Sequence, residues 1–187
     1  MMQAFAVWLL NRLGWRLVGG IPEVRQCVII FAPHTSNWDF PIMYLTKIAM
    51  GVKANFLGKH QLFRWPTGWF FRALGGIPVV RHEKHNVVTD SIQAFKDNPT
   101  LLLALAPEGT RSKTDHWRTG FYHIAVGAGV PLQLAFLDCR TRTLGLGPLL
   151  NLTGEIHADF ARIRQFYQDK QGFKPELTST VQPRPQA

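Results

Sequence analysis

The sequence predicts an α/β protein with one domain, in which a mostly parallel central sheet is flanked by helices. Three observations predict this class. Short apolar runs that suit buried strands alternate with longer segments of helical periodicity. The 187 residues, of which 46% are hydrophobic, are enough to bury one large core. No internal repeat or inter-domain linker divides the chain.

The first expected element is a helix over residues 3–18, rich in Trp, Leu and Arg. This composition suits a helix that lies in the headgroup layer of a membrane, and a core-packed first helix is the alternative because the apolar stripe is wide. We therefore expect a membrane-interfacial helix at residues 1–20 and the main domain at 21–173. Residues 174–187 have three prolines and no apolar period, which predicts a disordered tail.

Strands and helices are then expected in alternation. A buried strand over Cys27–Ala32 comes first. A helix from residue 37 to about residue 49 follows, with Ser36 as its N-cap and Asp39 in its first turn. The further strands are expected at 54–58, 101–105 and 131–137, and the further helices at 84–97, 119–127 and 158–169.

The charge balance is strongly basic, because 21 Lys and Arg residues against 12 Asp and Glu residues leave a formal net charge of +9. Such a protein attracts anionic partners, although a solvated basic surface without a specific partner is the alternative. No run approaches the roughly 20 apolar residues that span a bilayer, and the first residues lack the features of a signal peptide. We expect a peripheral, monotopic protein on the cytoplasmic face of a membrane.

His34 and Asp39 lie five residues apart, directly after the first buried strand. Within one helix this spacing would place them about 140° apart around the axis. They meet only if His34 lies in the loop and Asp39 in the first helical turn. An Asp that accepts from one ring nitrogen leaves the other nitrogen to take a proton. The alternative is structural: His34 ends a strand, and Asp39 stabilises a helix start.

The chain has no Ser in a nucleophile elbow that could partner this base. We therefore expect a substrate to supply the nucleophile, such as an alcohol that attacks an acyl thioester. Backbone N–H groups near the helix start after His34 are the expected donors to the oxyanion. No metal is expected, because neither the other histidines nor the two cysteines show ligand spacing.

A second polar cluster follows the strand expected at 101–105. Gly109 permits a tight turn, Arg111 offers a planar fork suited to phosphate, and Glu108 could hold a hydroxyl or orient Arg111. A surface turn with an ion pair is the alternative. Arg81 ends a glycine-led apolar segment and is another candidate phosphate ligand, or else a solvated charge at a strand end.

In this order and combination, the blocks resemble those of the glycerolipid acyltransferase family, typified by 1-acylglycerol-3-phosphate acyltransferase. The resemblance spans about residues 27–138 and includes Gly75–Arg81 and the apolar strand that contains Pro131. It implies that His34 is the general base and Asp39 its partner. It also implies a set of substrate-binding residues: Lys59, Arg81, Glu108, Gly109, Thr110 and Arg111.

The function expected from this resemblance is O-acyl transfer in phospholipid biosynthesis. A fatty acyl group would pass from acyl-carrier protein or coenzyme A to the hydroxyl of a lysolipid, with lysophosphatidic acid as the first candidate and a lyso-aminolipid or other acceptor as the alternative. No cofactor is expected beyond this co-substrate.

The competing class is a non-catalytic protein that binds anionic membranes or nucleic acid through its basic charge. We expect no nucleic-acid partner, because such a binder has no need for His34–Asp39 or Glu108–Arg111 at strand ends. Residues 59–72 alternate Lys and Arg with Trp and Phe, which suits a lipid interface, with core packing of the aromatic rings as the alternative.

Overall fold

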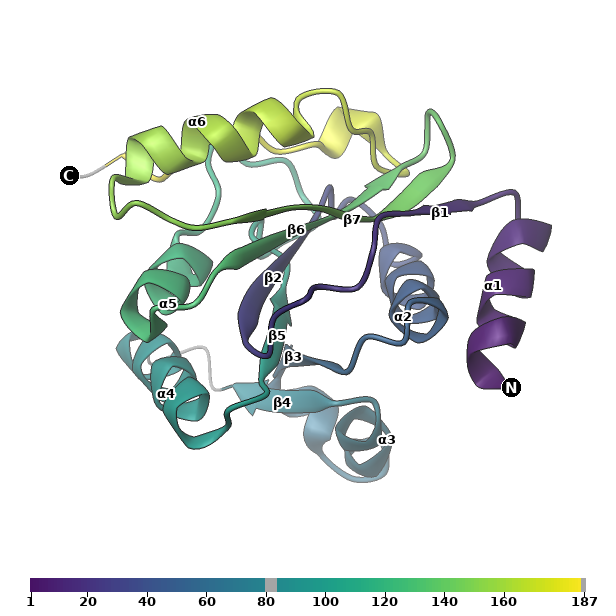
Figure 1. Ribbon diagram of the computed structural model, residues 1–187, viewed down its shortest axis with the longest axis horizontal. Helices are drawn as coiled ribbons and strands as arrows, with labels where there is room; N and C mark the ends of the chain where they lie inside the picture. Colours follow the sequence, from purple (N-terminus) through teal and green to yellow (C-terminus); the bar gives the residue numbers. More distant parts are fainter. Residues whose placement is uncertain (80–83, 186–187) are drawn as a thin grey trace.

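The computed structural model describes residues 1–79 and 84–185, and within these ranges the description excludes the side chains of 57–60, 62, 78–79 and 84–86. In the described part, seven strands form one sheet in the order β1-β7-β6-β2-β5-β3-β4, with helices on both faces (Figure 1). All neighbouring strands are parallel except β6 and β7. The predicted fold class is therefore confirmed.

The strands are β1 (Arg16–Val18), β2 (Cys27–Ala32), β3 (Ala54–Lys59), β4 (Gly76–Val79), β5 (Leu102–Leu105), β6 (Leu132–Asp138) and β7 (Thr143–Leu150). The helices are α1 (Met2–Arg12), α2 (Asp39–Ala49), α3 (Gly68–Ala73), α4 (Lys84–Asp97), α5 (Gly120–Ala128) and α6 (Ile156–Tyr167). Short 3-10 turns lie at His60–Phe63 and Pro175–Leu177.

Strand β2 lies between β6 and β5 in the middle of the sheet. All its residues are buried, which explains why its sequence is apolar throughout rather than alternating. Val28 and Ile30 pack into a core with α4, α5 and α6, whereas Ile29 and Phe31 pack into a second core with α1 and α2. The residues after β2 therefore emerge at the carboxyl end of a rigid strand, where sites gather in parallel sheets.

The strands and helices expected after residue 26 are present within about two residues of their expected bounds, but β4, β7 and α3 were not anticipated. The expected helix over residues 3–18 was wrong in its second half. Helix α1 ends at Arg12, and Arg16–Val18 instead form β1 beside β7. Gly14 adopts a left-handed conformation with φ of 79°, which ends a helix at little steric cost.

Helix α1 divides its apolar residues between core and surface. Ala6 and Leu10 are buried beside α2, and Nε2 of Gln3 donates to the carbonyl of Ala49 at 3.0 Å. The rings of Phe5 and Trp8 stack with centroids 5.8 Å apart, and both side chains are exposed. Among the described residues, no helix has the length and apolar character needed to cross a bilayer.

The aromatic residues of the 59–72 segment are divided in the same way. Phe63 is buried, so core packing holds for this ring. Trp65 and Trp69 are 93% and 71% exposed, and Phe70 is also exposed. Helix α3 begins just before Trp69 and presents Trp69 and Phe70 to solvent together with Arg72, whereas Trp65 lies in the turn before the helix.

Residues 174–185 do not have the disorder that the sequence predicted. We call residues 171–183 the return segment, because they run back along α6 (Figure 1). The Nε atom of Arg164 on α6 donates to the carbonyl of Val181 at 2.8 Å, and the N–H of Thr180 donates to the carbonyl of Thr114 at 3.0 Å. Backbone hydrogen bonds hold this segment, so it needs no apolar periodicity.

Candidate active site

His34 and Asp39 meet at the carboxyl end of β2. His34 lies in the loop after β2, and Asp39 is the first residue of α2. The Nδ1 atom of His34 lies 3.0 Å from Oδ2 of Asp39; the Asp39 side chain is buried, and a quarter of the His34 side chain is exposed. Because Nδ1 faces the carboxylate, the ring nitrogen Nε2 is left to exchange a proton with a substrate.

The loop before α2 is organised by Asp39 rather than by the expected Ser36 cap. Trp38 is the N-cap residue, and no side chain caps it. Instead, the N–H of Ser36 donates to Oδ2 of Asp39 at 2.7 Å, and Oγ of Ser36 accepts from the N–H of Trp38 at 3.2 Å. Two of the N–H groups near the helix start are thus already used within the loop, which removes them as oxyanion donors.

Glu108 contacts the His34 loop. Its side chain is 2% exposed, and Oε1 accepts from the N–H of His34 at 3.0 Å. Burial raises the pKa of Glu108 from 4.5 to about 7, against the lowering effects of the His34 N–H and ring, while nearby Asp39 raises it further. Within the described residues, Oε2 of Glu108, Oδ1 of Asp39 and Nδ1 of His34 have no hydrogen-bond partner, so the approach of Nδ1 to Oδ2 of Asp39 is an electrostatic contact. The sequence predicted that Glu108 holds a hydroxyl or orients Arg111, and it did not predict the hydrogen bond that Glu108 accepts from the His34 backbone.

The loop after β5 carries Gly109, Thr110 and Arg111. Gly109 has φ of 66°, and a Cβ atom there would lie only 2.5 Å from Nε of Arg118. The glycine is therefore needed both for the backbone conformation and for the space that Arg118 fills. Thr110 Oγ1 accepts from the N–H of Ser112 at 3.3 Å.

Arg111 and Arg118 both have exposed side chains, and neither forms an ion pair within the described part of the chain. Both are free to meet an anionic group. The sequence did not predict a role for Arg118, because its contact with Gly109 depends on how the loop between them folds.

The two remaining expected ligands fall on residues that the structure describes only in part or not at all. Lys59 ends β3, which pairs with both β5 and β4, but its side chain lies outside the description. Arg81 lies outside the described residues altogether. In the described part of the chain, no three His, Cys, Asp or Glu side chains gather as metal ligands would.

Helix α2 and the facing side of the sheet enclose an apolar cavity of about 70 Å³. Phe31 and Phe40 line the end near His34 and Asp39, whereas Met50 and Ala54 line the opposite end. Lys47 also lines the cavity, but its Nζ donates to the carbonyl of Leu74 at 2.8 Å, and burial lowers the pKa of this amine.

Comparison with known proteins adds two findings. The family model described as Acyltransferase matches residues 18–133. Among solved structures, the 1-acyl-sn-glycerophosphate (LPA) acyltransferase PlsC from Thermotoga maritima is similar in fold, with a TM-score of 0.56 and 20% identity over 89% of this chain and 73% of that chain. No curated protein matches the sequence.

Proposed function

Since the chain belongs to the acyltransferase family, we propose that this enzyme transfers a fatty acyl group from an acyl thioester to the hydroxyl of a lysolipid. One observation carries the proposal: the partly exposed ring of His34 is held at 3.0 Å from the buried carboxylate of Asp39. This is the base–orienter pair that hydroxyl activation needs. The similarity in fold to an LPA acyltransferase makes lysophosphatidic acid the first acceptor to test.

The reaction uses His34 twice. Nε2 takes the proton of the acceptor hydroxyl as its oxygen attacks the thioester carbonyl, and Asp39 stabilises the imidazolium that forms. The tetrahedral intermediate then expels the thiolate of coenzyme A or acyl-carrier protein, which takes the proton from His34. Atoms and charge balance without a further reactant, and the products are an ester and a thiol.

The apolar cavity is the proposed site of the acyl chain. It begins beside Phe40, the residue after Asp39, and extends toward Met50, just past the other end of α2. Ten residues of helix correspond to about 15 Å of length. Each methylene buried there contributes about 0.8 kcal/mol of binding, so an acyl chain is favoured over a short acyl group.

The acceptor head group is proposed to bind at the loop after β5. Arg111 and Thr110 are exposed or half-buried there, and Arg118 packs against Gly109 in the same loop. The guanidinium groups of Arg111 and Arg118 have no ion-pair partner within the described residues, and such groups suit a phosphate monoester. Lys59 and Arg81 stay predicted ligands of the same head group, and a lyso-aminolipid is the alternative acceptor.

The acceptor and product are membrane lipids, so a membrane-binding surface is part of the proposal. Exposed aromatic side chains gather on α1 and around α3: Phe5, Trp8, Trp65, Trp69 and Phe70. Aromatic rings beside basic residues favour the lipid interface, and the net charge of +9 favours anionic lipids. The enzyme is therefore proposed to bind the membrane peripherally, on the cytoplasmic side.

Acyl transfer by the purified protein tests the proposal. The assay supplies labelled acyl-coenzyme A or acyl-carrier protein and a panel of lysolipids in vesicles. We expect product from the wild type and a loss of about 10²–10⁴-fold in kcat for His34→Ala, because general base catalysis contributes this much. Asp39→Asn should lose activity too, since an amide does not stabilise the imidazolium.

An exposed histidine away from the site provides the matched control. His157→Ala removes a ring on the surface of α6, and its activity should equal that of the wild type. Transfer by folded His34→Ala at the wild-type rate would remove His34 as the base. Binding to vesicles without transfer to any acceptor would instead support the non-catalytic alternative.

A further inference from the structure

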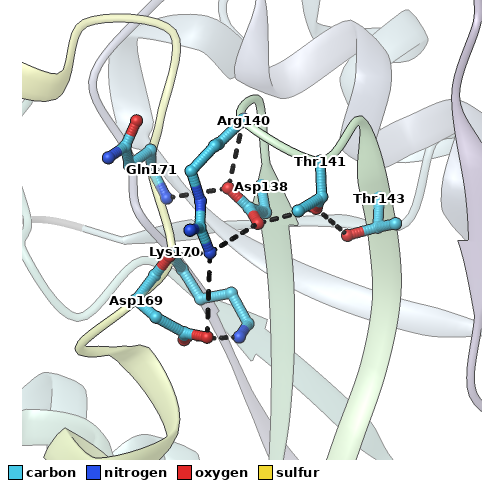
Figure 2. A network of polar contacts seen from close by, with 7 residues as sticks. All are labelled: Asp138, Arg140, Thr141, Thr143, Asp169, Lys170 and Gln171. Atoms are coloured by element: carbon cyan, nitrogen blue, oxygen red, sulfur yellow. Dashed lines mark hydrogen bonds and ion pairs between the residues drawn. The ribbon is translucent and has the colours of Figure 1, made fainter.

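The return segment, residues 171–183, begins at a fixed point beside the carboxyl end of β6. The N–H of Gln171 donates to Oδ1 of Asp138 at 3.2 Å, and the carbonyl of Gln171 accepts from the N–H of Cys139 at 2.7 Å. Asp138 is buried and also accepts from Thr141 Oγ1 at 2.7 Å, in the network that Figure 2 shows. The start of the segment is therefore anchored to the sheet.

The segment next contacts the loop that carries His34. Gly172 is buried, and a Cβ atom there would lie 2.5 Å from Oγ1 of Thr35 and 3.3 Å from Cβ of Pro33. The N–H of Lys174 donates to the same Oγ1 of Thr35 at 3.1 Å. Thr35 is 2% exposed, so this hydroxyl serves the return segment rather than solvent.

The far end of the segment contacts the loop that follows Glu108–Arg111. Oγ of Ser179 accepts from the N–H of Thr114 at 3.1 Å, and the N–H of Trp117 donates to the carbonyl of Gln182 at 2.9 Å. This loop closes on itself, because the N–H of the residue after Trp117 donates to the carbonyl of Pro107 at 2.9 Å. One segment is thus bonded to both loops that form the proposed site.

We propose that the return segment is a positioning element for acyl transfer, which holds the loop of the base and the loop of the head-group ligands in register. The inference rests on the proposed function, and it assigns a role to Gly172, Lys174 and Ser179, which lie outside every motif of the sequence. Thr35 is the link on the catalytic side, because it is joined to His34 by a peptide bond and bonded to Lys174. Ser179 is the link on the acceptor side.

The physical reason is the precision that catalysis demands. A displacement of about 1 Å at a reacting group costs on the order of 10²-fold in rate. The hydrogen bond to Glu108 fixes the His34 backbone, and Asp39 lies 3.0 Å from the His34 ring. The contact of Gly172 with Thr35 limits movement of the same loop. Loss of that contact should lower kcat without weakening substrate binding.

Substitution of Thr35 tests the catalytic link. Thr35→Val keeps the shape and removes the acceptor of the Lys174 N–H, whereas Thr35→Ser keeps the hydroxyl. We expect kcat of Thr35→Val to fall about 10–100-fold with both KM values within about twofold, and Thr35→Ser to restore most of the rate. Equal kcat of folded Thr35→Val and wild type would overturn the proposal, as would equal losses in the Val and Ser variants.

Substitution of Gly172 tests the same contact from the other partner. The Cβ of Gly172→Ala must push the segment away from Thr35, whereas Gly20→Ala adds its methyl group to open space. We expect faster hydrogen exchange of residues 33–39 and a lower kcat in Gly172→Ala only. Unchanged exchange would overturn the proposal whatever the activity, so this readout stands apart from the acyl-transfer assay.

Ser179→Ala tests the acceptor link, and it lies away from His34. We expect a higher KM for the acceptor with little change in kcat. The loop of Thr114 loses the hydrogen bond to Ser179, whereas the contacts of His34 are unchanged. A wild type without acyl transfer would refute the proposed function alone. A wild type that transfers, with unchanged kinetics in Thr35→Val, Gly172→Ala and Ser179→Ala, would refute the positioning role alone.

Discussion

At the scale of single residues, burial decides which polar groups hold the site and which meet substrate. Glu108 and Asp39 are almost fully buried, and each contacts the residue proposed as the base. His34 and Arg111 keep exposed atoms that a ligand can reach. A buried carboxylate without full hydrogen bonding is costly in its charged form, which explains the raised pKa of Glu108.

The raised pKa of Glu108 predicts a pH-dependent stability. The folded state binds more protons than the unfolded state between pH 4.5 and about 7, so the free energy of unfolding falls as the pH rises through this window. Glu108→Gln removes the effect. Relative to this variant, the wild type should lose on the order of 2–3 kcal/mol across the window. Urea unfolding at a series of pH values measures the difference.

Exposed Glu23 offers the control for this experiment. Glu23→Gln removes a carboxylate that lies at the surface, and its unfolding curve should run parallel to that of the wild type. Parallel curves for wild type and Glu108→Gln would contradict the prediction, because they would place the ionisation of Glu108 outside this window.

At the scale of elements, α2 carries two parts of the proposed site. Its first residue, Asp39, contacts the ring proposed as the base. Phe40 and Met43 on its inner face, and Met50 just beyond its end, line the apolar cavity. The helix packs on β2, whose side chains Ile29 and Phe31 form the opposite wall. The proposed base and the proposed acyl-chain site therefore adjoin the same helix, so a substitution at the far end of the cavity should change substrate preference without touching His34.

Ala54→Leu should shift the enzyme toward shorter acyl donors. Ala54 begins β3 at the end of the cavity away from His34, and a larger side chain there removes space for the last carbons of the chain. We expect kcat/KM for long-chain donors, relative to short-chain donors, to fall at least about tenfold. A chain-length series of acyl-coenzyme A substrates measures this ratio. The control Ala158→Leu adds the same atoms to the exposed face of α6.

Ala158→Leu should keep the wild-type preference for acyl-chain length. An unchanged preference in folded Ala54→Leu would mean that the acyl chain lies elsewhere, even if the protein transfers acyl groups.

At the scale of the whole molecule, the protein combines exposed aromatic rings with a net positive charge, and both favour binding to anionic lipid. The rings lie on α1 and around α3, and their side chains are exposed. Removing two exposed indoles should weaken membrane binding, because each large side chain contributes roughly 1.5–3 kcal/mol when buried.

The double variant Trp65→Ser and Trp69→Ser should bind anionic vesicles at least about tenfold more weakly than the wild type, with an unchanged melting temperature. Co-sedimentation with vesicles measures the affinity. Val126→Ser is the control, since Val126 is 43% exposed on α5, which packs in the other core. Vesicle binding equal to that of the wild type would exclude these tryptophans from the membrane surface.

The sequence alone determined the class of fold and the two loops where the chemistry is proposed. The strand Cys27–Ala32 is recognisable because both faces of this central parallel strand are buried, so every side chain is apolar. Leu102–Leu105 is equally apolar, although three of its four residues are only half-buried. The spacing of His34 and Asp39 predicted a loop and a helix start, because no single helix brings them together. These features depend on neighbours along the chain.

The tertiary structure alone decided contacts between residues far apart in the chain. The bond from Glu108 to the His34 backbone spans 74 positions, and that from the Lys174 N–H to Thr35 spans 139. Neither has a local pattern, because a hydrogen bond to a loop backbone leaves no periodicity in the sequence. For the same reason residues 174–187 were predicted to be disordered. The partners of this stretch are polar side chains and backbone groups from distant elements, such as Thr35 Oγ1 and Arg164 Nε, and only folding brings them within reach.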